Sequence, residues 1–378
     1  MNKILTSWNL KFRSTYLGLL ILLFACNNSK PADKPFQKFT YSIDTLTIDS
    51  KEHLLFVGYG IPMVKLSEKE RFLHFYDPLN HAIEKIDLEN KEGVNTLYLD
   101  KEGPNGVLDH NRFDYIPISD SSYRFFTKKN FKDLSLSNNL IKTSKPIDSL
   151  VKISEENETQ FSSLISSNLQ YLYGLTSDFN QEQKLVWIDL GDYTLKESDL
   201  DSMKYRENYK ISLDGMIVSG MIGSTFLNEK LLVYHSDGID LYEIDPKSGN
   251  KRFINNRPEI TPQRKAGNFP RNVEKSEAVK ALELESLEID YKEIVFDEEN
   301  QRFYRIASQQ TENKGRTKVY LLIFDHELNL ISELDLSSLD MKNSANYFTR
   351  KGKLYFLNKE TEDLEFFVFD LKSTISNE

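Results

Sequence analysis

Cysteine, proline, glycine and tryptophan are all scarce in this chain. Its 378 residues include 1 Cys, 11 Pro, 16 Gly and 2 Trp. A single cysteine excludes a disulfide framework and any cysteine-rich zinc or iron–sulfur site, so packing and backbone hydrogen bonds must hold the fold. The 58 acidic residues outnumber the 48 basic ones, which argues against nucleic acid as a partner because phosphate binding needs a basic face. The chain is instead rich in aromatic residues, and its 24 Phe and 19 Tyr can fill the core of a globular body.

The first 25 residues have the zones of an export signal. A basic start is followed by an apolar run from Leu17 to Ala25 and then by Cys26. The run is about half of the ~20 apolar residues that span a bilayer, so we do not expect it to stay as a membrane helix. Leu23–Cys26 resembles the lipobox of bacterial lipoproteins, in which the cysteine is acylated and becomes the new amino terminus. An ordinary export signal followed by an incidental cysteine is the alternative interpretation.

These features divide the chain into three parts. We expect residues 1–25 to be a lipoprotein signal peptide, residues 26–38 a flexible tether and residues 39–378 a single β-propeller domain. Loss of the signal removes three positive charges and no negative ones, which leaves a net charge of −13. The protein is then expected in the bacterial cell envelope, attached to a membrane through a lipid on Cys26. We favour the outer membrane over the inner one, with the body in the periplasm or at the cell surface.

One strand type recurs along the chain and predicts the fold. It opens with an aromatic residue or Leu after a polar turn, and its copies begin 48 to 72 residues apart at Phe72, Tyr123, Tyr171, Leu231, Phe303 and Leu354. A second strand follows most copies, and five of these contain an Ile-Asp or Phe-Asp step whose aspartate is expected to start the next turn. A period near 50 residues with about four strands per unit predicts an all-β, six-bladed β-propeller. Seven blades stay open as an alternative, because residues 192–221 are hard to divide into strands.

The two ends of the domain are expected to meet. The last blade lacks an outer strand, and the early run Phe39–Asp49 can supply it, which would close the ring and remove an exposed edge. Strand order places the long connections on one face, including the insertion from Asn255 to Leu287, and binding residues usually lie on such loops. Within that insertion, the apolar spacing of Glu274–Ile289 predicts one short amphipathic helix.

Several of these segments resemble a known family. They are the lipobox, the early strand Tyr41–Asp49, the Glu102–Gly106 loop and the strand Asp297–Ile306 with its Phe-Tyr-Arg step. Together they resemble an uncharacterised family of propeller lipoproteins of the Bacteroidota, over most of the mature chain. The resemblance implies the fold and the envelope location, and it brings no assigned activity or catalytic residues.

Motifs of known chemistry are missing from the sequence. It contains no HExxH, GxSxG, P-loop, EF-hand or dinucleotide-binding signature, so we expect no metal site and no cofactor. Among the six histidines, His74 and His81 could approach each other across one hairpin, and a solvated or hydrogen-bonded imidazole is the favoured interpretation of each. Among 58 acidic residues, some carboxylates are neighbours by chance alone. A catalytic pair is defined by the distance between its carboxylates in space, so the sequence does not identify one.

The segment Lys251–Lys275 departs from the acidic composition of the chain. It carries seven Lys and Arg against two Glu, a net charge of +5. We take Arg257, Arg264, Lys265 and Arg271 as candidate ligand-binding residues, and add Asn105 from a Gly-Pro-Asn-Gly turn that could present backbone N–H groups. Such a set could bind an anionic glycan or an acidic patch of an envelope protein. The alternative is that these cations pair with acids of their own protein.

These observations lead to two hypotheses about function. The first is a lipid-anchored envelope propeller that binds a ligand or protein, or acts as a scaffold, through its long-loop face. The second is an envelope hydrolase or lyase with its catalytic site in the central channel. The fold by itself does not choose between them.

Overall fold

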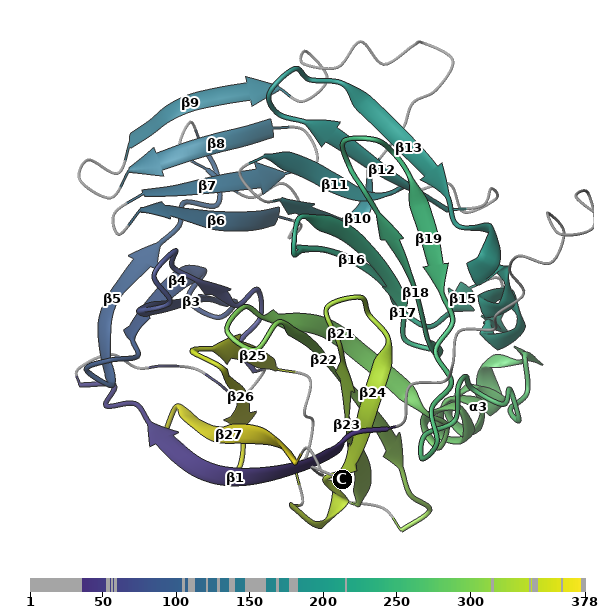
Figure 1. Cartoon of the computed structure of the whole chain (residues 1–378). Helices are drawn as coiled ribbons and strands as arrows, with labels where there is room; N and C mark the ends of the chain where they lie inside the picture. The colour runs from purple at the N-terminus through teal and green to yellow at the C-terminus, as the bar shows by residue number, and fades with distance from the viewer. Residues whose placement is uncertain are drawn as a thin grey trace, which may run out of the picture. The chain divides into compact units, whose positions relative to one another are not determined.

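The computed structural model describes residues 36–51, 55, 57, 60–103, 106–107, 113–119, 122–127, 130–135, 140–146, 161–167, 170–176, 183–214, 216–313, 316–339, 341, 346–361 and 363–374. Residues Gln37–Glu378 form one compact unit. Within the described part of this unit, six four-stranded antiparallel sheets follow one another around a ring (Figure 1). The predicted six-bladed β-propeller is therefore confirmed.

In blades 1 to 5 the strands run in chain order from the innermost outward. Blade 1 contains β2 (Lys65–Leu66), β3 (Phe72–Asp77), β4 (Ala82–Asp87) and β5 (Glu92–Tyr98). Blade 2 contains β6 (Phe113–Ser119), β7 (Ser122–Thr127), β8 (Asn130–Ser135) and β9 (Leu140–Pro146). Blade 3 contains β10 (Phe161–Ser167), β11 (Tyr171–Thr176), β12 (Lys184–Asp189) and β13 (Leu195–Asp199). Blade 4 contains β16 (Ile222–Leu227), β17 (Lys230–His235), β18 (Gly238–Ile244) and β19 (Lys251–Ile254). Blade 5 contains β21 (Asp290–Asp297), β22 (Arg302–Gln310), β23 (Thr317–Phe324) and β24 (Leu330–Asp335).

Blade 6 is made from both ends of the domain. It contains β25 (Tyr347–Arg350), β26 (Lys353–Asn358) and β27 (Glu365–Thr374), and its outer strand is β1 (Lys38–Thr47). β1 pairs with β27 in an antiparallel register that runs from Lys38 opposite Thr374 to Thr47 opposite Glu365. The predicted closure by the early strand is confirmed, and the ladder covers the edge of β27 that would otherwise be exposed.

The recurring aromatic-led strand is the second strand of every blade. All six copies found in the sequence fall in β3, β7, β11, β17, β22 and β26. The aspartate after the third strand has the predicted turn role, because Asp87 Oδ1 accepts the backbone N–H groups of Glu89 and Asn90 at 2.9 and 3.1 Å. Asp245 does the same for Lys247 and Ser248 in blade 4. These residues are therefore structural. The prediction is wrong for Asp370, which lies inside β27 opposite Ser42 and starts no turn, because β27 continues to Thr374 to pair with β1.

Buried hydrophobic clusters lie between successive blades. They join blades 1 and 2, 2 and 3, 3 and 4, 5 and 6, and 6 and 1, and are represented by Tyr123, Val186, Trp187, Tyr304 and Phe366. The aromatic residues of the second strands supply much of this packing, which explains why that strand carries the repeat. Burying a large aromatic or aliphatic side chain contributes about 1.5–3 kcal/mol, so the second strand of each blade is a main source of stability.

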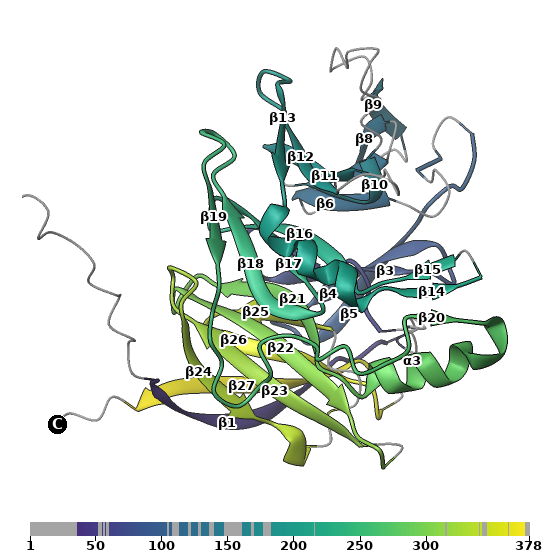
Figure 2. The ribbon, with the colours of Figure 1, turned by 90° about the vertical axis from the view of Figure 1, so that its right-hand side faces the viewer.

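Two insertions extend the face that the sequence predicts to carry the long loops. The first, between β13 and β16, holds a 3-10 helix (Asp201–Tyr209), β14 (Ile211–Leu213) and β15 (Met216–Val218). The second, between β19 and β21, holds β20 (Asn272–Val273), a 3-10 turn (Lys275–Glu277) and α3 (Ala278–Ser286). β14 pairs with β20 in parallel and with β15, and α3 packs beside this small sheet (Figure 2). Residues 192–221 thus supply β13 of blade 3 and two of the three strands of a small sheet outside the ring, and they form no seventh blade among the described residues. Helix α3 confirms the predicted helix.

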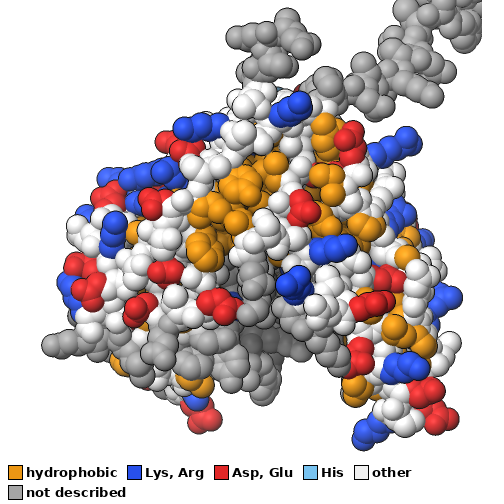
Figure 3. Space-filling view, turned by 90° about the horizontal axis from the view of Figure 1, so that it is seen from below, with side chains coloured by type: hydrophobic (Ala, Val, Ile, Leu, Met, Phe, Trp, Pro, Cys, Tyr) orange, Lys and Arg blue, Asp and Glu red, His pale blue; other side chains and the backbone are white. Residues whose placement is uncertain are grey.

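The surface of the described part mixes both charges. In the view from below, hydrophobic side chains gather in a patch on one face, and Lys, Arg, Asp and Glu surround it (Figure 3).

A short 3-10 turn (Ser337–Leu339) precedes blade 6. No helix within the described ranges has both the length and the apolar character needed to cross a bilayer.

Candidate ligand cavity

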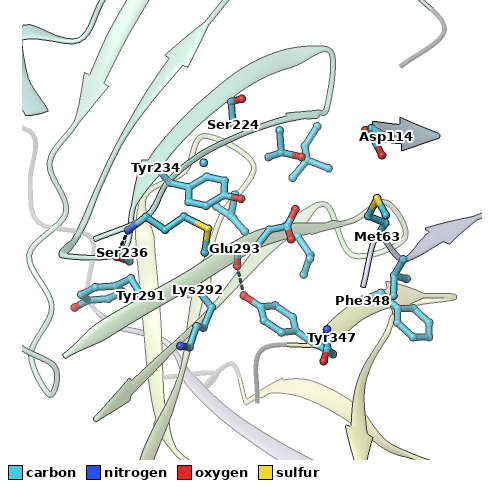
Figure 4. Close-up of a pocket in the computed structure, with 18 of the residues that line it drawn as sticks. Met63, Asp114, Ser224, Tyr234, Ser236, Tyr291, Lys292, Glu293, Tyr347 and Phe348 are labelled. Carbon is cyan, nitrogen blue, oxygen red and sulfur yellow. Dashed lines mark hydrogen bonds between the residues drawn. The ribbon is translucent and has the colours of Figure 1, made fainter. Parts of the chain in front are cut away.

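A cavity of about 1120 Å³ lies where the innermost strands face one another (Figure 4). Its wall comes from the first strands of five blades, β2, β6, β16, β21 and β25, and from Tyr173 of β11. Residues of the two insertions, among them Ser219 and Lys265, also line it. The cavity therefore reaches the long-loop face, and its volume suits an organic ligand of moderate size.

A β-bulge in β21 presents Glu293 to this cavity. Tyr291 pairs with Ala307 and Ile294 pairs with Arg305, so two residues of β21, Lys292 and Glu293, oppose a single residue of β22. Such a bulge interrupts the regular ladder and re-aims a side chain, and it leaves backbone groups that need other partners. In Figure 4 the Glu293 carboxylate points into the cavity.

Two side chains hold the backbone of the bulge. Arg305 Nε donates to the carbonyl oxygen of Lys292 at 2.8 Å. The Tyr347 hydroxyl donates to the carbonyl oxygen of Glu293 and accepts the N–H of Ile306 at 3.2 Å. The two carbonyl groups of the bulge and the N–H of Ile306 opposite it are therefore paired. This pairing makes the bulge a fixed feature of the cavity wall.

Arg305 also joins blades 4 and 5. Its side chain is fully buried, and its remaining N–H groups donate to the carbonyl oxygens of His235, Gly238 and Ile239 at 2.8 to 3.1 Å. The guanidinium lies 5.4 Å from the ring centre of Tyr234 and 5.1 Å from that of Tyr291. Burial lowers the pKa of Arg305, while the nearby tyrosines act in the opposite direction.

Glu293 is an acidic group of the cavity wall that has no counter-ion among the described residues. Its side chain keeps accessible surface because it borders the cavity, while protein surrounds the cavity on several sides. This burial raises the pKa of the Glu293 carboxyl; Lys65 lowers it and Asp114 raises it further. Among the described residues, no hydrogen bond or salt bridge is made by the Glu293 carboxylate.

The lysines of the cavity wall are paired with carboxylates other than Glu293. Lys65 Nζ lies 3.2 Å from Asp114 Oδ1, and Lys292 forms a salt bridge with Asp290. Lys265 Nζ lies 2.8 Å from Asp237 Oδ1 and also contacts Glu285. Each of the three lysines that line the cavity therefore has a carboxylate of its own.

Tyrosines form much of the remaining wall. Burial raises the pKa of Tyr173, Tyr234 and Tyr347, so these phenols stay protonated at neutral pH. Gly223 makes room for Tyr234, because a Cβ at that position would lie 2.5 Å from the tyrosine ring. The wall thus combines tyrosine side chains with the Glu293 carboxylate.

His74 and His81, which could approach each other across one hairpin, instead form separate hydrogen bonds with different tyrosines. His74 Nδ1 pairs with the Tyr123 hydroxyl at 3.1 Å, and His81 Nδ1 pairs with the Tyr76 hydroxyl at 2.8 Å. Burial, with a smaller contribution from Lys85, lowers the pKa of His74 to about 3. Within the part of the chain that the structure describes, no three His, Cys, Asp or Glu side chains are grouped as metal ligands.

Comparison with known protein families identifies the family of the chain. The model of the family described as "Domain of unknown function (DUF4221)" matches residues 37–335. The chain belongs to the DUF4221 family. This confirms the resemblance to an uncharacterised propeller family that the sequence motifs indicated.

Two solved structures have the fold of this DUF4221 protein. A DUF4221 member from Bacteroides vulgatus is 14% identical, with a TM-score of 0.64 over 90% of this chain and 100% of the other. A protein from Bacteroides fragilis described as a putative exported protein is 10% identical, with a TM-score of 0.51 over 89% and 96% of the two chains. At these identities the likeness shows the fold alone. No curated protein matches this DUF4221 chain in sequence.

The basic segment of the DUF4221 protein is partly internal. Arg264 Nη2 lies 2.6 Å from Oδ2 of the buried Asp240, and its guanidinium lies 3.7 Å from the Tyr205 ring centre. Lys265 is buried and forms salt bridges with Asp237 and Glu285. Pairing within the protein, the alternative left open by the sequence, therefore accounts for these two cations.

The other candidate residues lie elsewhere. Arg257 and Arg271 are exposed, and Arg271 Nη1 contacts the carbonyl oxygen of Asn208 at 3.5 Å. Cys26 and Asn105 fall outside the described residues. Glu293 was not among the candidates taken from the sequence. The Phe-Tyr-Arg step of β22 was noted, and it contains Arg305, which donates a hydrogen bond to the backbone of the bulge at Glu293.

Proposed function

We propose that this DUF4221 protein is a non-enzymatic binding module of the cell envelope that takes a small ligand into the central cavity from its long-loop face. The observation that carries the proposal is the bulge at Glu293, fixed by Arg305 and Tyr347, which presents an unpaired carboxylate to a cavity of about 1120 Å³. Fixing a polar group in a pocket before the ligand arrives lowers the entropic cost of binding.

The second candidate is the envelope hydrolase or lyase. The raised pKa of Glu293 favours it, since burial that raises the pKa of a carboxyl group moves it toward the range in which it can act as a general acid. Against it, acid–base hydrolysis of a glycoside needs a second carboxylate near the first. Asp114, whose charge acts on Glu293, is already paired with Lys65 at 3.2 Å, and Glu285 and Asp290 are paired with Lys265 and Lys292. The binding function is therefore our first choice.

Ligand retention tests the binding function. The detergent-solubilised protein is incubated with an envelope extract, washed and denatured, and the released molecules are identified by mass spectrometry. Ser219→Trp, an exposed position on the cavity wall, should reduce recovery of the ligand about tenfold because the indole occupies the entrance. The control is Leu79→Trp, which is 58% exposed and lies outside the cavity. Equal recovery from all three proteins would rule out the cavity as the site, and release of a chemically changed molecule would support the enzyme.

We also propose that a lipid on Cys26 anchors the protein to the outer membrane. The export-like signal, and the description of the B. fragilis neighbour as exported, support an envelope location. Cys26→Ser should move most of the protein from the membrane pellet to the soluble fraction, because acyl attachment needs the thiol. Ser29→Ala in the same tether serves as the control, and membrane attachment that persists in Cys26→Ser contradicts the proposal.

A partner on the outer surface is a separate proposal. Arg257 and Arg271 are exposed on the second insertion, where they could meet an anionic glycan or an acidic patch of an envelope protein. Asn105 belongs to the same proposal from its position in the sequence alone.

A further inference from the structure

The charges that line the cavity do not balance. The acidic residues are Glu68, Asp114, Glu285, Asp290 and Glu293, and the basic residues are Lys65, Lys265 and Lys292. Five carboxylates against three ammonium groups leave a local excess of negative charge. A pocket of one sign, walled by protein, concentrates ligands of the opposite sign.

Among the described residues, none of the three lysines is paired with Glu293 or Glu68, so the excess lies on these two carboxylates. Glu68 is exposed in the turn between β2 and β3, whereas Glu293 lies in the bulge of the inner strand β21. Lys65, Lys265 and Lys292 each contact a carboxylate other than Glu293. A ligand that enters the cavity therefore meets the Glu293 carboxylate without first having to displace a lysine. The lysines are also held away from an anionic ligand, because such a ligand would have to compete with their present partners.

The apolar part of the wall suits a cation as well. Tyr173, Tyr234 and Tyr347 present aromatic rings, and Met63 and Met221 present thioethers. The face of an aromatic ring carries negative potential and attracts ammonium groups within about 6 Å of its centre, most strongly where water is excluded. Methionine side chains adapt to ligand bodies of varied shape.

We propose that the cavity binds an organic cation, with the ammonium group against Glu293 and the apolar body against the tyrosine and methionine side chains. This inference rests on the proposed function, and it names the chemical class of the ligand. It differs from the anionic ligand that the composition of Lys251–Lys275 indicated, because Arg264 and Lys265 of that segment are paired inside the protein.

Three probes that share one ring and differ in charge test the inference. Benzyltrimethylammonium, benzyl alcohol and benzoate are titrated into the detergent-solubilised protein by isothermal calorimetry. We expect the cation to bind at least tenfold more tightly than the alcohol and benzoate to bind most weakly. Equal or tighter binding of the alcohol or of benzoate overturns the inference, and so does the failure of all three probes to bind.

Variants then test whether the negative charge that attracts the cation belongs to Glu293. Glu293→Gln keeps the shape of the side chain and removes its charge, so it should weaken the cation about tenfold and leave benzyl alcohol unchanged. Glu299→Gln makes the same change at an exposed position in the turn after β21 and should alter neither affinity. Lys292→Met releases Asp290 and should tighten the cation severalfold, which is a gain that loss of folding cannot imitate. Unchanged cation binding in Glu293→Gln overturns the assignment.

The two levels of the proposal fail in different ways. If the extract experiment retains a ligand that is lost in Ser219→Trp, but the cation shows no preference over benzyl alcohol, the cavity function stands and the cation is excluded. If Ser219→Trp changes nothing in the extract experiment, the proposed function itself is excluded.

Discussion

Deletion of Lys38–Thr47 is expected to abolish cooperative unfolding of the protein. The deletion removes the whole β1–β27 ladder and exposes the edge of β27. It also removes Phe39 and Leu46, which are buried on either side of blade 6 in the clusters shared with blades 5 and 1. Loss of one such side chain costs about 2–5 kcal/mol, and a typical domain has only about 5–15 kcal/mol in total.

Thermal unfolding followed by circular dichroism measures this effect. Deletion of residues 27–35, which the sequence predicts to be part of the tether, is the control and should leave the melting temperature unchanged. A synthetic peptide with the sequence of Lys38–Thr47 should restore part of the transition by adding a strand to β27. A normal melting temperature for the β1 deletion would show that the ring does not depend on its closing strand.

Arg264→Glu is expected to destabilise the protein by about 3–5 kcal/mol, whereas Arg257→Glu should change the stability by less than about 0.5 kcal/mol. Asp240 is fully buried, and reversal at Arg264 replaces its partner at 2.6 Å with a second carboxylate. Arg257 carries the same charge in the same segment but is exposed. Urea unfolding of the two variants measures the difference. If the two variants have the same free energy of unfolding, Arg264 does not stabilise the fold through Asp240 and could instead bind an anionic ligand.

The pH dependence of the Arg264→Glu variant provides a second check. Burial raises the pKa of Asp240, and Arg264 acts against that rise. Without the arginine, the folded-state pKa of Asp240 should rise further above its unfolded value. A carboxyl of this kind binds its proton more tightly in the folded state, so stability should increase as pH falls through its folded pKa. Part of the loss measured at pH 7 should therefore be recovered at pH 5.

The fold could be predicted because its determinants are local and repeated. The strand type that begins at Phe72 recurs in every blade, aspartate turns such as Asp87 recur in several, and each copy needs only its neighbours to form. The closure of the ring by β1 could be predicted by counting strands, because the last blade had no outer strand of its own. Helix α3 followed from apolar spacing within a single segment.

The site could not be predicted because it depends on contacts between distant segments. The bulge at Glu293 exists only where Arg305 and Tyr347 come from neighbouring strands to pair with its backbone. Charge counting along Lys251–Lys275 gave +5, but the carboxylates that neutralise Arg264 and Lys265 lie in blade 4, at Asp240 and Asp237. Composition reports the number of charges in a segment and carries no information about their partners.

The position of β1 also determines when the protein can finish folding. Of the described strands, the first to be synthesised pairs with the last, and the Thr374 hydroxyl donates to the carbonyl oxygen of Lys38 across 336 positions of the chain. Blades 1 to 5 can form in order as the chain emerges, but β1 must wait without a partner until β27 is complete. The ring therefore closes only after translation of the domain has finished, and a chain truncated before β27 would expose both unpaired edges to proteases and to other chains.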